Sequence, residues 1–383
     1  MSIFITGSTG YLGSYVVTDL LRHNDERLLL LVRARDGEEA LQRLWRSLQL
    51  HMDFVEFRQY MAERVEVCLG ELTEPKLGLS LRAYEQATQA TDSIIHIAAS
   101  LNRRSEKSCL NVNLRGTLAM IKFALAAHKD HGLKRFSDVS TTAVAGERQS
   151  ETIFEDSAIE WDRSDYDPYA RSKKFCEHMV GELLTDIPHT IFRPSTVIGD
   201  SKRPLTTQFD MLRAFVFLAR LPVIPLSPHA RVDIVPADYV GHAIAAIHTS
   251  HDPKHGIYHL SAGTGSLTAR EMVTQLKLSG KPIRGRLVER LSGPTGSLSN
   301  FLADTPRGWG VSKAASLLKV FWPYITFDTV FDNQRVIEEV GEIPVPCTEY
   351  MSELMDFGMS NGFAYPYLPW PEGQSVEVTL CPH

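Results

Sequence analysis

The stretch that decides the expected fold is MSIFITGSTGYLGS, residues 1–14. Its first part, Ser2 to Thr6, is a short apolar run rich in β-branched residues, which is typical of a buried strand. The apolar-periodic stretch from Tyr11 to Leu21 predicts a helix, and three glycines recur at every third position where strand passes into helix. Glycine lets the backbone turn tightly beside a ligand, while the free N–H groups at the start of a helix attract a pyrophosphate. Strand, glycine turn and helix together predict the phosphate end of a dinucleotide site.

Strands and helices continue to alternate along the first half of the chain. The pattern predicts strands at 27–32, 65–69, 93–97 and 135–139, and helices at 109–128 and 168–184. We therefore expect an α/β protein built on a doubly wound parallel Rossmann sheet. The Rossmann domain should occupy residues 1–200, with 229–250 returning to it, and 201–383 should form mainly a smaller C-terminal substrate-binding lobe and a tail. The tail is rich in Tyr, Pro and Trp from Phe363 to Trp370, and it could cap the pocket or simply pack as a tail.

Composition and charge exclude several classes of protein. With 383 residues and 43% hydrophobic content, the chain can bury a full core. A net charge of −6 with no dominant basic stripe argues against nucleic acid as a partner. The longest apolar runs, such as Ala214 to Leu226, are too short and too interrupted to form a transmembrane segment. The first strand begins almost at Met1, which leaves no room for a secretion signal, so we expect a cytoplasmic protein.

The cysteines are consistent with the same compartment. They are Cys68, Cys109, Cys176, Cys347 and Cys381, and they form neither a CxxC pair nor a regular framework. Their odd number and irregular spacing predict reduced thiols.

Arginines follow the second expected strand, at the position where this architecture meets the adenosine ribose. An acidic residue there selects NAD, whereas an arginine accepts the 2′-phosphate of NADP. The chain has Arg33 and Arg35 after the strand and Arg43 on the following helix. Because a guanidinium group suits phosphate oxygens, the sequence predicts NADPH as the cofactor, with Arg33 on the 2′-phosphate and Arg43 able to close on the same group.

The centre of the expected chemistry is the segment Pro168-Tyr169-Ala170-Arg171-Ser172-Lys173, which opens a helix. Tyr169 and Lys173 are four residues apart and therefore share one helix face. A neighbouring ammonium group favours the phenolate and moves the pKa of a tyrosine from about 10 toward the operating pH. The phenol could then exchange a proton with a carbonyl oxygen or an alcohol as a hydride moves. Thr141, at the end of the strand 135–139, could donate a second hydrogen bond to the same oxygen.

Histidines provide no clear metal motif. Five of them lie close together in the later part of the chain: His242, His248, His251, His255 and His259. Pro253 and Gly256 break any shared helix face, so the spacing yields no converging ligand set and we expect no metal. His96, inside the strand 93–97, is interpreted as a packed side chain.

These motifs, in this order, resemble the extended short-chain dehydrogenase/reductase family over roughly residues 1–260. The resemblance rests on Thr6-Gly7-Ser8-Thr9-Gly10-Tyr11-Leu12-Gly13, Asn113, Thr141, Tyr169 and Lys173. Further segments look like its thioester reductase branch, which includes the terminal reductase domains of carboxylic acid reductases and of nonribosomal peptide synthetases. They are Val32-Arg33-Ala34 with Ala40 and Arg43-Leu44, Gly70-Glu71-Leu72-Thr73 with Leu77-Gly78-Leu79, and Arg193-Pro194-Ser195 with Gly199-Asp200-Ser201.

The resemblance implies a role for each matching residue. Cofactor contacts would come from Gly7, Ser8, Thr9, Gly10, Tyr11, Leu12, Gly13, Arg33, Arg43, Glu71, Leu72, Ile97, Ala98, Ala99, Asn113, Tyr169, Lys173 and Ser195, and catalysis from Thr141, Tyr169 and Lys173. Thr9 to Leu12 would meet the pyrophosphate, and Glu71 with Leu72 the adenine. The family usually has aspartate where this chain has Glu71, which is the one visible departure.

The function implied by this resemblance is NADPH-dependent reduction of an acyl thioester, held on a carrier protein or on coenzyme A, to an aldehyde, with the alcohol as an optional further product. Two alternatives stay open. One is a reductase, dehydrogenase or sugar-type epimerase that acts on a free small molecule. The other is a non-catalytic NADP-sensing protein, and the presence of both Tyr169 and Lys173 argues against it.

Overall fold

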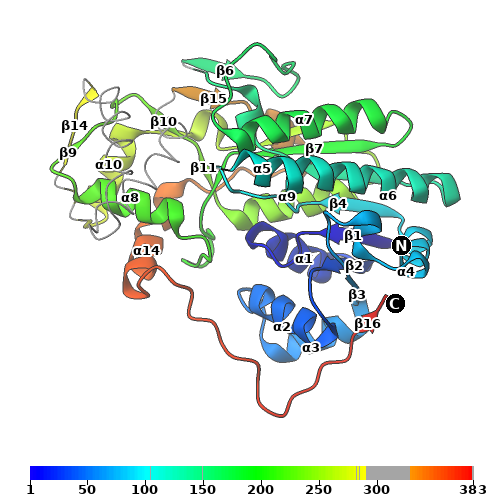
Figure 1. Cartoon of the computed structure of the whole chain (residues 1–383). Coiled ribbons are helices and arrows are strands. Elements are labelled where there is room, and N and C mark those ends of the chain that lie inside the picture. The colour runs from blue at the N-terminus through cyan, green and yellow to red at the C-terminus, as the bar shows by residue number, and fades with distance from the viewer. Residues whose placement is uncertain (104, 149, 282, 284, 290–327, 382–383) are drawn as a thin grey trace.

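A computed structural model describes residues 1–103, 105–148, 150–281, 283, 285–289 and 328–381. Its centre is a parallel eight-stranded sheet in the order β12-β7-β5-β4-β1-β2-β3-β16 (Figure 1). The strands are β1 (Ser2–Thr6), β2 (Arg27–Val32), β3 (Val65–Leu69), β4 (Ser93–His96), β5 (Arg135–Val139), β7 (His189–Pro194), β12 (Ile257–Leu260) and β16 (Thr379–Leu380). The order proceeds outward from β1 in both directions, which confirms the doubly wound parallel sheet expected from the sequence.

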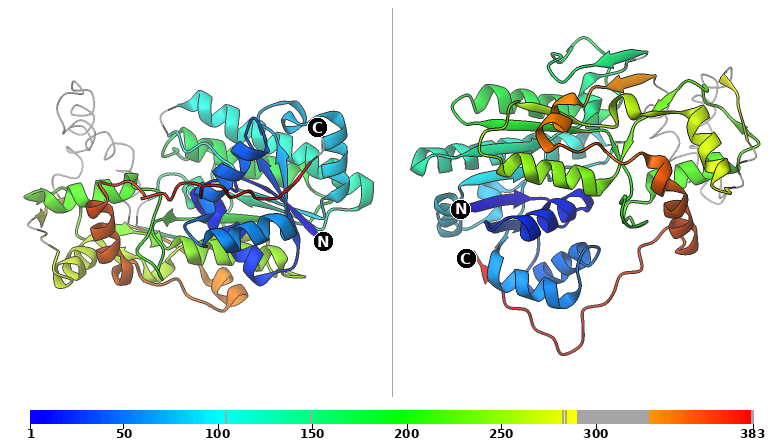
Figure 2. Two further views of the ribbon diagram at one scale, coloured as in Figure 1. Left: turned by 90° about the horizontal axis from the view of Figure 1, so that it is seen from below. Right: turned by 180° about the vertical axis from the view of Figure 1, so that it is seen from behind.

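Helices cover both faces of this sheet (Figures 1 and 2). One face carries α1 (Tyr11–His23), α2 (Gly37–Leu48), α3 (Phe54–Arg64), α9 (Ala237–Thr249) and α13 (Gln334–Val340), and the other α4 (Leu81–Ala90), α6 (Arg115–His131) and α7 (Pro168–Leu183). The two-residue period of β1 explains this division, because Ile3 and Ile5 pack in the cluster with α1 and α9 whereas Phe4 packs with α4 and α6. No helix in the described part of the chain is long and apolar enough to cross a membrane.

Helix α9 comes from the segment expected to return to the Rossmann domain, and it lies directly against α1. A Cβ atom at Gly241 would come within 2.6 Å of the Tyr15 Cβ, so the two backbones approach closely only because residue 241 is glycine. Two strands of the sheet, β12 and β16, come from outside the ranges that the sequence analysis assigned to this domain. The sheet therefore draws on more of the chain than the periodicity indicates.

A smaller lobe lies beyond the carboxyl edge of the sheet (Figure 1). It contains α8 (Asp210–Arg220), α10 (Ala269–Leu278), α14 (Cys347–Ser360) and the strand pairs β9 (Val223–Ile224) with β14 (Arg286–Leu287) and β10 (Arg231–Val232) with β13 (Leu267–Thr268). Two further pairs are β8 (Thr196–Val197) with β11 (Ile234–Val235) and β6 (Glu151–Ile153) with β15 (Thr329–Phe331). The lobe has an apolar cluster of its own, which includes Leu212, Ala269 and Leu354. Residues 290–327 of the expected lobe lie outside the described residues.

The C-terminal tail contacts both the cavity and the helices beside the sheet. Near its start, Phe363 lines the cavity at the carboxyl edge of the sheet. Further along, Trp370 packs edge-on against Phe54 of α3, with ring centroids 5.0 Å apart. The tail then ends as β16 beside β3 (Figures 1 and 2).

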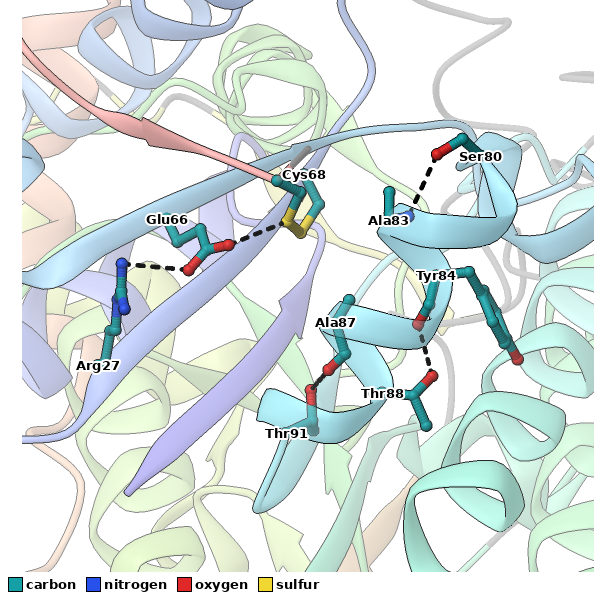
Figure 3. The surroundings of a disulfide bond; sticks show 10 residues. Arg27, Glu66, Cys68, Ser80, Ala83, Tyr84, Ala87, Thr88 and Thr91 are labelled. Atoms are coloured by element: carbon teal, nitrogen blue, oxygen red, sulfur yellow. Dashed lines mark hydrogen bonds and ion pairs between the residues drawn. A yellow bond between two sulfur atoms is a disulfide. The ribbon is translucent and has the colours of Figure 1, made fainter. Parts of the chain in front are cut away.

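Two of the five cysteines form a disulfide, which corrects the expectation of reduced thiols. Cys381, directly after β16, is bonded to Cys68 of β3 (Figure 3). The pairing of Leu380 with Val67 brings these residues together although they are 313 positions apart. Cys109, Cys176 and Cys347 are free and buried. Sequence spacing missed the bond because only the packing of the tail against the sheet creates it.

Candidate active site

A cavity of about 1070 Å³ opens at the carboxyl ends of the central strands, the edge at which parallel α/β sheets bind ligands. Most of the predicted site residues line it: Gly7, Thr9, Gly10, Tyr11, Leu12, Gly13, Arg33, Arg43, Glu71, Leu72, Ile97, Ala98, Ala99, Thr141, Tyr169 and Ser195. Three others, Ser8, Asn113 and Lys173, are buried behind its wall. Residues far apart in the sequence therefore share one space.

The glycine turn forms one end of this cavity. Gly7 has a φ of +80°, and a Cβ there would lie 2.7 Å from the Ala98 nitrogen. A Cβ at Gly13 would lie 2.0 Å from the Gly7 carbonyl oxygen, so both positions exclude any side chain. Helix α1 begins after Gly10 without a side-chain cap, which leaves its first N–H groups for a ligand. This cradle fits the pyrophosphate of a dinucleotide.

Arg33 and Arg43 lie together where β2 ends. The Arg43 Nη1 donates to the Arg33 carbonyl oxygen at 2.6 Å, and the Arg33 Nη1 lies 3.2 Å from the Glu71 Oε2. The Arg33 side chain is 70% exposed, so its pairing with Glu71 is weak and can be exchanged for a phosphate. Arg35 instead pairs with Glu39 and does not line the cavity. The pair Arg33 and Arg43 fits a ribose 2′-phosphate.

Tyr169 and Lys173 occupy the first turns of α7. Asp167 caps this helix by accepting a hydrogen bond from the Ala170 N–H at 2.8 Å, and Pro168 occupies its first position. The helix therefore starts immediately beside the cavity and presents Tyr169 to it. The Lys173 Nζ is buried and donates to the Val139 carbonyl oxygen at 2.6 Å, which ties the helix to the end of β5.

The charges around this pair differ from the sequence expectation. Burial raises the pKa of the Tyr169 phenol, and the positive charges of Lys173 and Arg103 offset this only in part. The expected lowering is wrong for this state of the molecule because removing water favours the neutral phenol more than one ammonium group favours the phenolate. Burial lowers the pKa of Lys173, but the buried carboxylate of Asp138 and other neighbours outweigh it and the pKa is raised. At neutral pH the site therefore holds a protonated phenol beside a charged ammonium group.

Thr141 lies at the end of β5, on the wall of the same cavity. Its Oγ1 accepts a hydrogen bond from the Ala143 N–H at 3.3 Å and so caps the short helical turn Thr142–Ala145. Because the oxygen is the acceptor in that bond, the hydroxyl hydrogen can still donate.

Asn113 acts behind the wall of the cavity. It lies in a single π-helical turn, Leu110–Leu114, which leads into α6. Its Oδ1 accepts from the Ser100 N–H at 2.7 Å and its Nδ2 donates to the Ser172 Oγ at 2.8 Å. Ser172 in turn donates to the Tyr169 carbonyl oxygen at 2.8 Å. Asn113 therefore links the loop after β4 to the first turn of α7.

Several lining residues come from the lobe, and the sequence analysis did not identify them. They include Gln208, Phe209, Met211, Arg213, Arg231 and Asp233. Asp233 is buried, and its Oδ1 accepts from the Ser195 Oγ at 2.6 Å and from the Ala262 N–H at 2.9 Å. None of these residues belongs to a motif with recognisable spacing, so no sequence signal marks them.

Asp233 should make the stability of the protein depend on pH. Burial raises its pKa to about 6, although the hydrogen bonds from Ala262 and Ser195 act in the opposite direction. The folded state therefore binds a proton more tightly than the unfolded chain, where an aspartate has a pKa of about 3.9. This contribution to stability is complete below about pH 4 and is lost as the pH rises through about 6. Between pH 4.5 and 7, the free energy of unfolding should fall by about 2 kcal/mol less in Asp233→Asn than in the wild type. Urea titrations at the two pH values measure the difference.

The exposed Asp186 provides the matched control for this measurement. Asp186→Asn should retain the pH dependence of the wild type. Equal pH dependence in Asp233→Asn and in the wild type would show that the buried carboxyl does not bind the proton.

One of the five histidines noted in the sequence, His242 of α9, joins a polar cluster with Asp19 and His23 of α1. The Asp19 Oδ1 lies 3.2 Å from the His23 Nδ1 and 3.1 Å from the His242 Nδ1. The hydrogen bond with Asp19 raises the pKa of His242. The three groups are of metal-ligating types, but they lie away from the cavity, and the absence of a metal stays a prediction. His96 is fully buried beside Thr6, as a packed side chain should be.

The fold and the site together define an extended short-chain dehydrogenase/reductase: a Rossmann sheet with a glycine turn and a Tyr-x-x-x-Lys helix facing one cavity. Residues 5–244 match the family described as "Male sterility protein", and the chain belongs to that family. The resemblance recognised from the sequence is thereby confirmed.

The chain is also similar to several named proteins. It is 29% identical over 275 residues to the L-2-aminoadipate reductase large subunit of Penicillium chrysogenum, covering 67% of this chain and 19% of that protein. The terminal R domain from the myxalamid PKS-NRPS biosynthetic pathway has the same fold, with a TM-score of 0.79, 24% identity, and coverage of 94% of this chain and 91% of that one. A thiolation-reductase di-domain from an archaeal nonribosomal peptide synthetase gives a TM-score of 0.72 at 16% identity, with 94% and 76% covered. The chain spans about a quarter or less of the length of its curated relatives, for example 5% of one and 26% of another.

Proposed function

We propose that the chain is an NADPH-dependent reductase that converts an acyl thioester to an aldehyde and can reduce the aldehyde further to the alcohol. The observation that carries this proposal is that one cavity is lined by three groups of residues. The glycine turn and Arg33 form one part of the lining, Tyr169 lies beside the strand ends, and Phe209 and Met211 come from the lobe. The part with the glycine turn suits a dinucleotide, and the part lined by the lobe suits an acyl group.

When bound, the cofactor supplies the hydride. Tyr169 holds its proton at neutral pH because burial raises its pKa, so its hydroxyl can donate a hydrogen bond to the thioester oxygen as negative charge develops there. The Thr141 hydroxyl, on the same wall, supplies a second donor. Two donors directed at one oxygen stabilise the developing oxyanion without forming a covalent bond to the protein. When the carbonyl re-forms, the carbon–sulfur bond breaks and the thiol of the carrier protein or of coenzyme A leaves, which releases the aldehyde.

Lys173 keeps the phenol in a positive field. Its ammonium group is anchored on the Val139 carbonyl oxygen, and its charge opposes the rise in the pKa of Tyr169. When the phenol gives up its proton to an aldehyde oxygen, this charge stabilises the phenolate that remains. The family resemblance adds a hydrogen bond from Lys173 to the cofactor ribose.

Presentation of the acyl group by a carrier protein is part of the proposal. It is supported by similarity to a thiolation-reductase di-domain and to the terminal R domain of a synthetase pathway. Coenzyme A is the alternative thiol, since it ends in the same kind of arm.

The test is a stoichiometric assay of the purified chain with NADPH and three substrates of equal acyl length: a carrier-protein thioester, a coenzyme A thioester and a free ketone. We expect NADPH oxidation and aldehyde release with a thioester, faster from the carrier than from coenzyme A. One NADPH per acyl group indicates that reduction stops at the aldehyde, and two indicate the alcohol. Reduction of the ketone with both thioesters left intact would favour an enzyme of free carbonyl compounds, and NADPH binding without any turnover would favour a sensor.

A further inference from the structure

The C-terminal strap, defined as residues 361–381, connects the lobe to the far edge of the sheet. It leaves α14 and runs past α2 and α3 without helix or strand until β16 (Figures 1 and 2). Its end is fixed twice, by the pairing of β16 with β3 and by the bond between Cys381 and Cys68 (Figure 3). Both ends of the strap are therefore held.

The middle of the strap is also held, against α2 and the residue that follows it. The Gln49 side chain accepts a hydrogen bond from the Leu368 N–H at 2.6 Å and donates to the Leu368 carbonyl oxygen at 3.2 Å. Trp45 donates from its Nε1 to the Pro369 carbonyl oxygen at 3.4 Å. These contacts determine where the preceding residue, Tyr367, lies.

Tyr367 supports an arginine at a second, smaller cavity. The Arg46 guanidinium carbon lies 4.1 Å from the centre of the Tyr367 ring, a cation–π arrangement. A cavity of about 230 Å³ is lined by both residues and also by Thr9, Gly10 and Arg43, which line the main cavity as well. Arg46 therefore shares the lining of this cavity with two residues of the glycine turn.

We propose that Arg46 is a further cofactor-binding residue, which donates to the pyrophosphate of the dinucleotide, and that Tyr367 positions it. This inference rests on the proposed function, because it concerns the same cofactor. No carboxylate in the described part of the chain forms an ion pair with Arg46, whereas Arg33 is paired with Glu71. An exposed guanidinium group without an acidic partner beside the free N–H groups of α1 completes an anion site.

The neighbours of Arg46 distinguish the pyrophosphate from the 2′-phosphate as its ligand. Arg43 lines the small cavity too, but its side chain is hydrogen-bonded to Arg33 at the end of β2, whereas Arg46 lies almost one turn further along α2 and stacks on the Tyr367 ring. NADH and NADPH share the pyrophosphate, and only NADPH has the 2′-phosphate. Arg46 should therefore contribute equally to the binding of both.

The experiment is a calorimetric titration of the full chain with NADPH and, separately, with NADH. Arg46→Gln should weaken the binding of both dinucleotides about tenfold, and Tyr367→Ala should weaken both about threefold. Tyr367→Phe, which retains an aromatic face, should bind like the wild type. Arg58→Gln is the matched control, because Arg58 is an exposed arginine of α3 that contacts the strap at Gln374 and lines neither cavity.

Unchanged affinity in Arg46→Gln, with a wild-type melting temperature, would overturn the inference while leaving the proposed function intact. A loss confined to NADPH would overturn it as well, since Arg46 would then serve the 2′-phosphate. If the wild-type chain binds neither dinucleotide, the proposed function fails, and the role of Arg46 fails with it. Equal losses in Arg58→Gln and Arg46→Gln would attribute the effect to net charge alone and would also contradict the inference.

Discussion

Tyr169→Phe should lower the turnover number with an acyl thioester about 1,000-fold, within the range usual for removal of a general acid. The substitution removes only the hydroxyl, and the ring that fills the cavity wall stays in place beneath the Arg103 guanidinium group. Because the phenol is protonated in the folded protein, the loss removes a donor that stabilises the developing oxyanion. Steady-state kinetics at saturating NADPH measures the effect.

The affinity for NADPH should stay within about threefold of the wild type, because a hydrogen bond to a neutral group contributes little to binding. Tyr84→Phe is the control, since Tyr84 is a half-buried tyrosine of α4 that packs on Phe123 away from the cavity. Turnover in Tyr169→Phe close to that of the wild type would remove Tyr169 from the chemistry. A parallel collapse of NADPH affinity would show that the hydroxyl serves binding rather than proton donation.

The double variant Arg33→Gln/Arg43→Gln should weaken NADPH binding about 100-fold and leave NADH binding nearly unchanged. Each guanidinium group that donates to a phosphate contributes about 1.5–3 kcal/mol, and exposure of Arg33 to solvent reduces its share. The two together should therefore contribute about 3 kcal/mol, which corresponds to the stated factor. Titration of the variant with both dinucleotides measures it.

Arg35→Gln is the matched control for this pair. Arg35 is 86% exposed, pairs with Glu39 and contributes nothing to the lining of either cavity, so its loss should leave both affinities unchanged. Equal weakening of NADH and NADPH in the double variant would assign Arg33 and Arg43 to a part of the cofactor that the two dinucleotides share. The preference for NADPH would then need another origin.

Local pattern was sufficient for the first five strands of the central sheet and for the glycine turn and the Tyr169 helix that line the cavity. The run from Ser2 to Thr6 is followed by glycines at which any side chain would clash. A Cβ at Gly13 would lie 2.0 Å from the Gly7 carbonyl oxygen, so no other residue type would allow this turn. Tyr169 and Lys173 lie on the same face of one helix because their spacing of four residues is close to one helical turn. In each case the deciding interaction lies within a few residues of sequence, where residue type and period express it directly.

The protonation state of the site depended on the tertiary structure. The spacing of Tyr169 and Lys173 predicts a lowered pKa for the phenol, whereas burial by the surrounding elements raises it. Desolvation depends on everything that covers a group, and the sequence near Tyr169 does not contain that information.

What the sequence by itself determined is the parallel α/β core, the glycine turn and the family to which the chain belongs, because short-range periodicity and steric demand specify them. Only the tertiary structure decided the bond between Cys68 and Cys381, the place of Asp233 beside Ser195, and the stacking of Tyr367 on Arg46. The partners in these pairs are separated by tens to hundreds of residues, and neither partner carries a local signal of the other. Packing of the lobe and the C-terminal strap against the sheet brings them together.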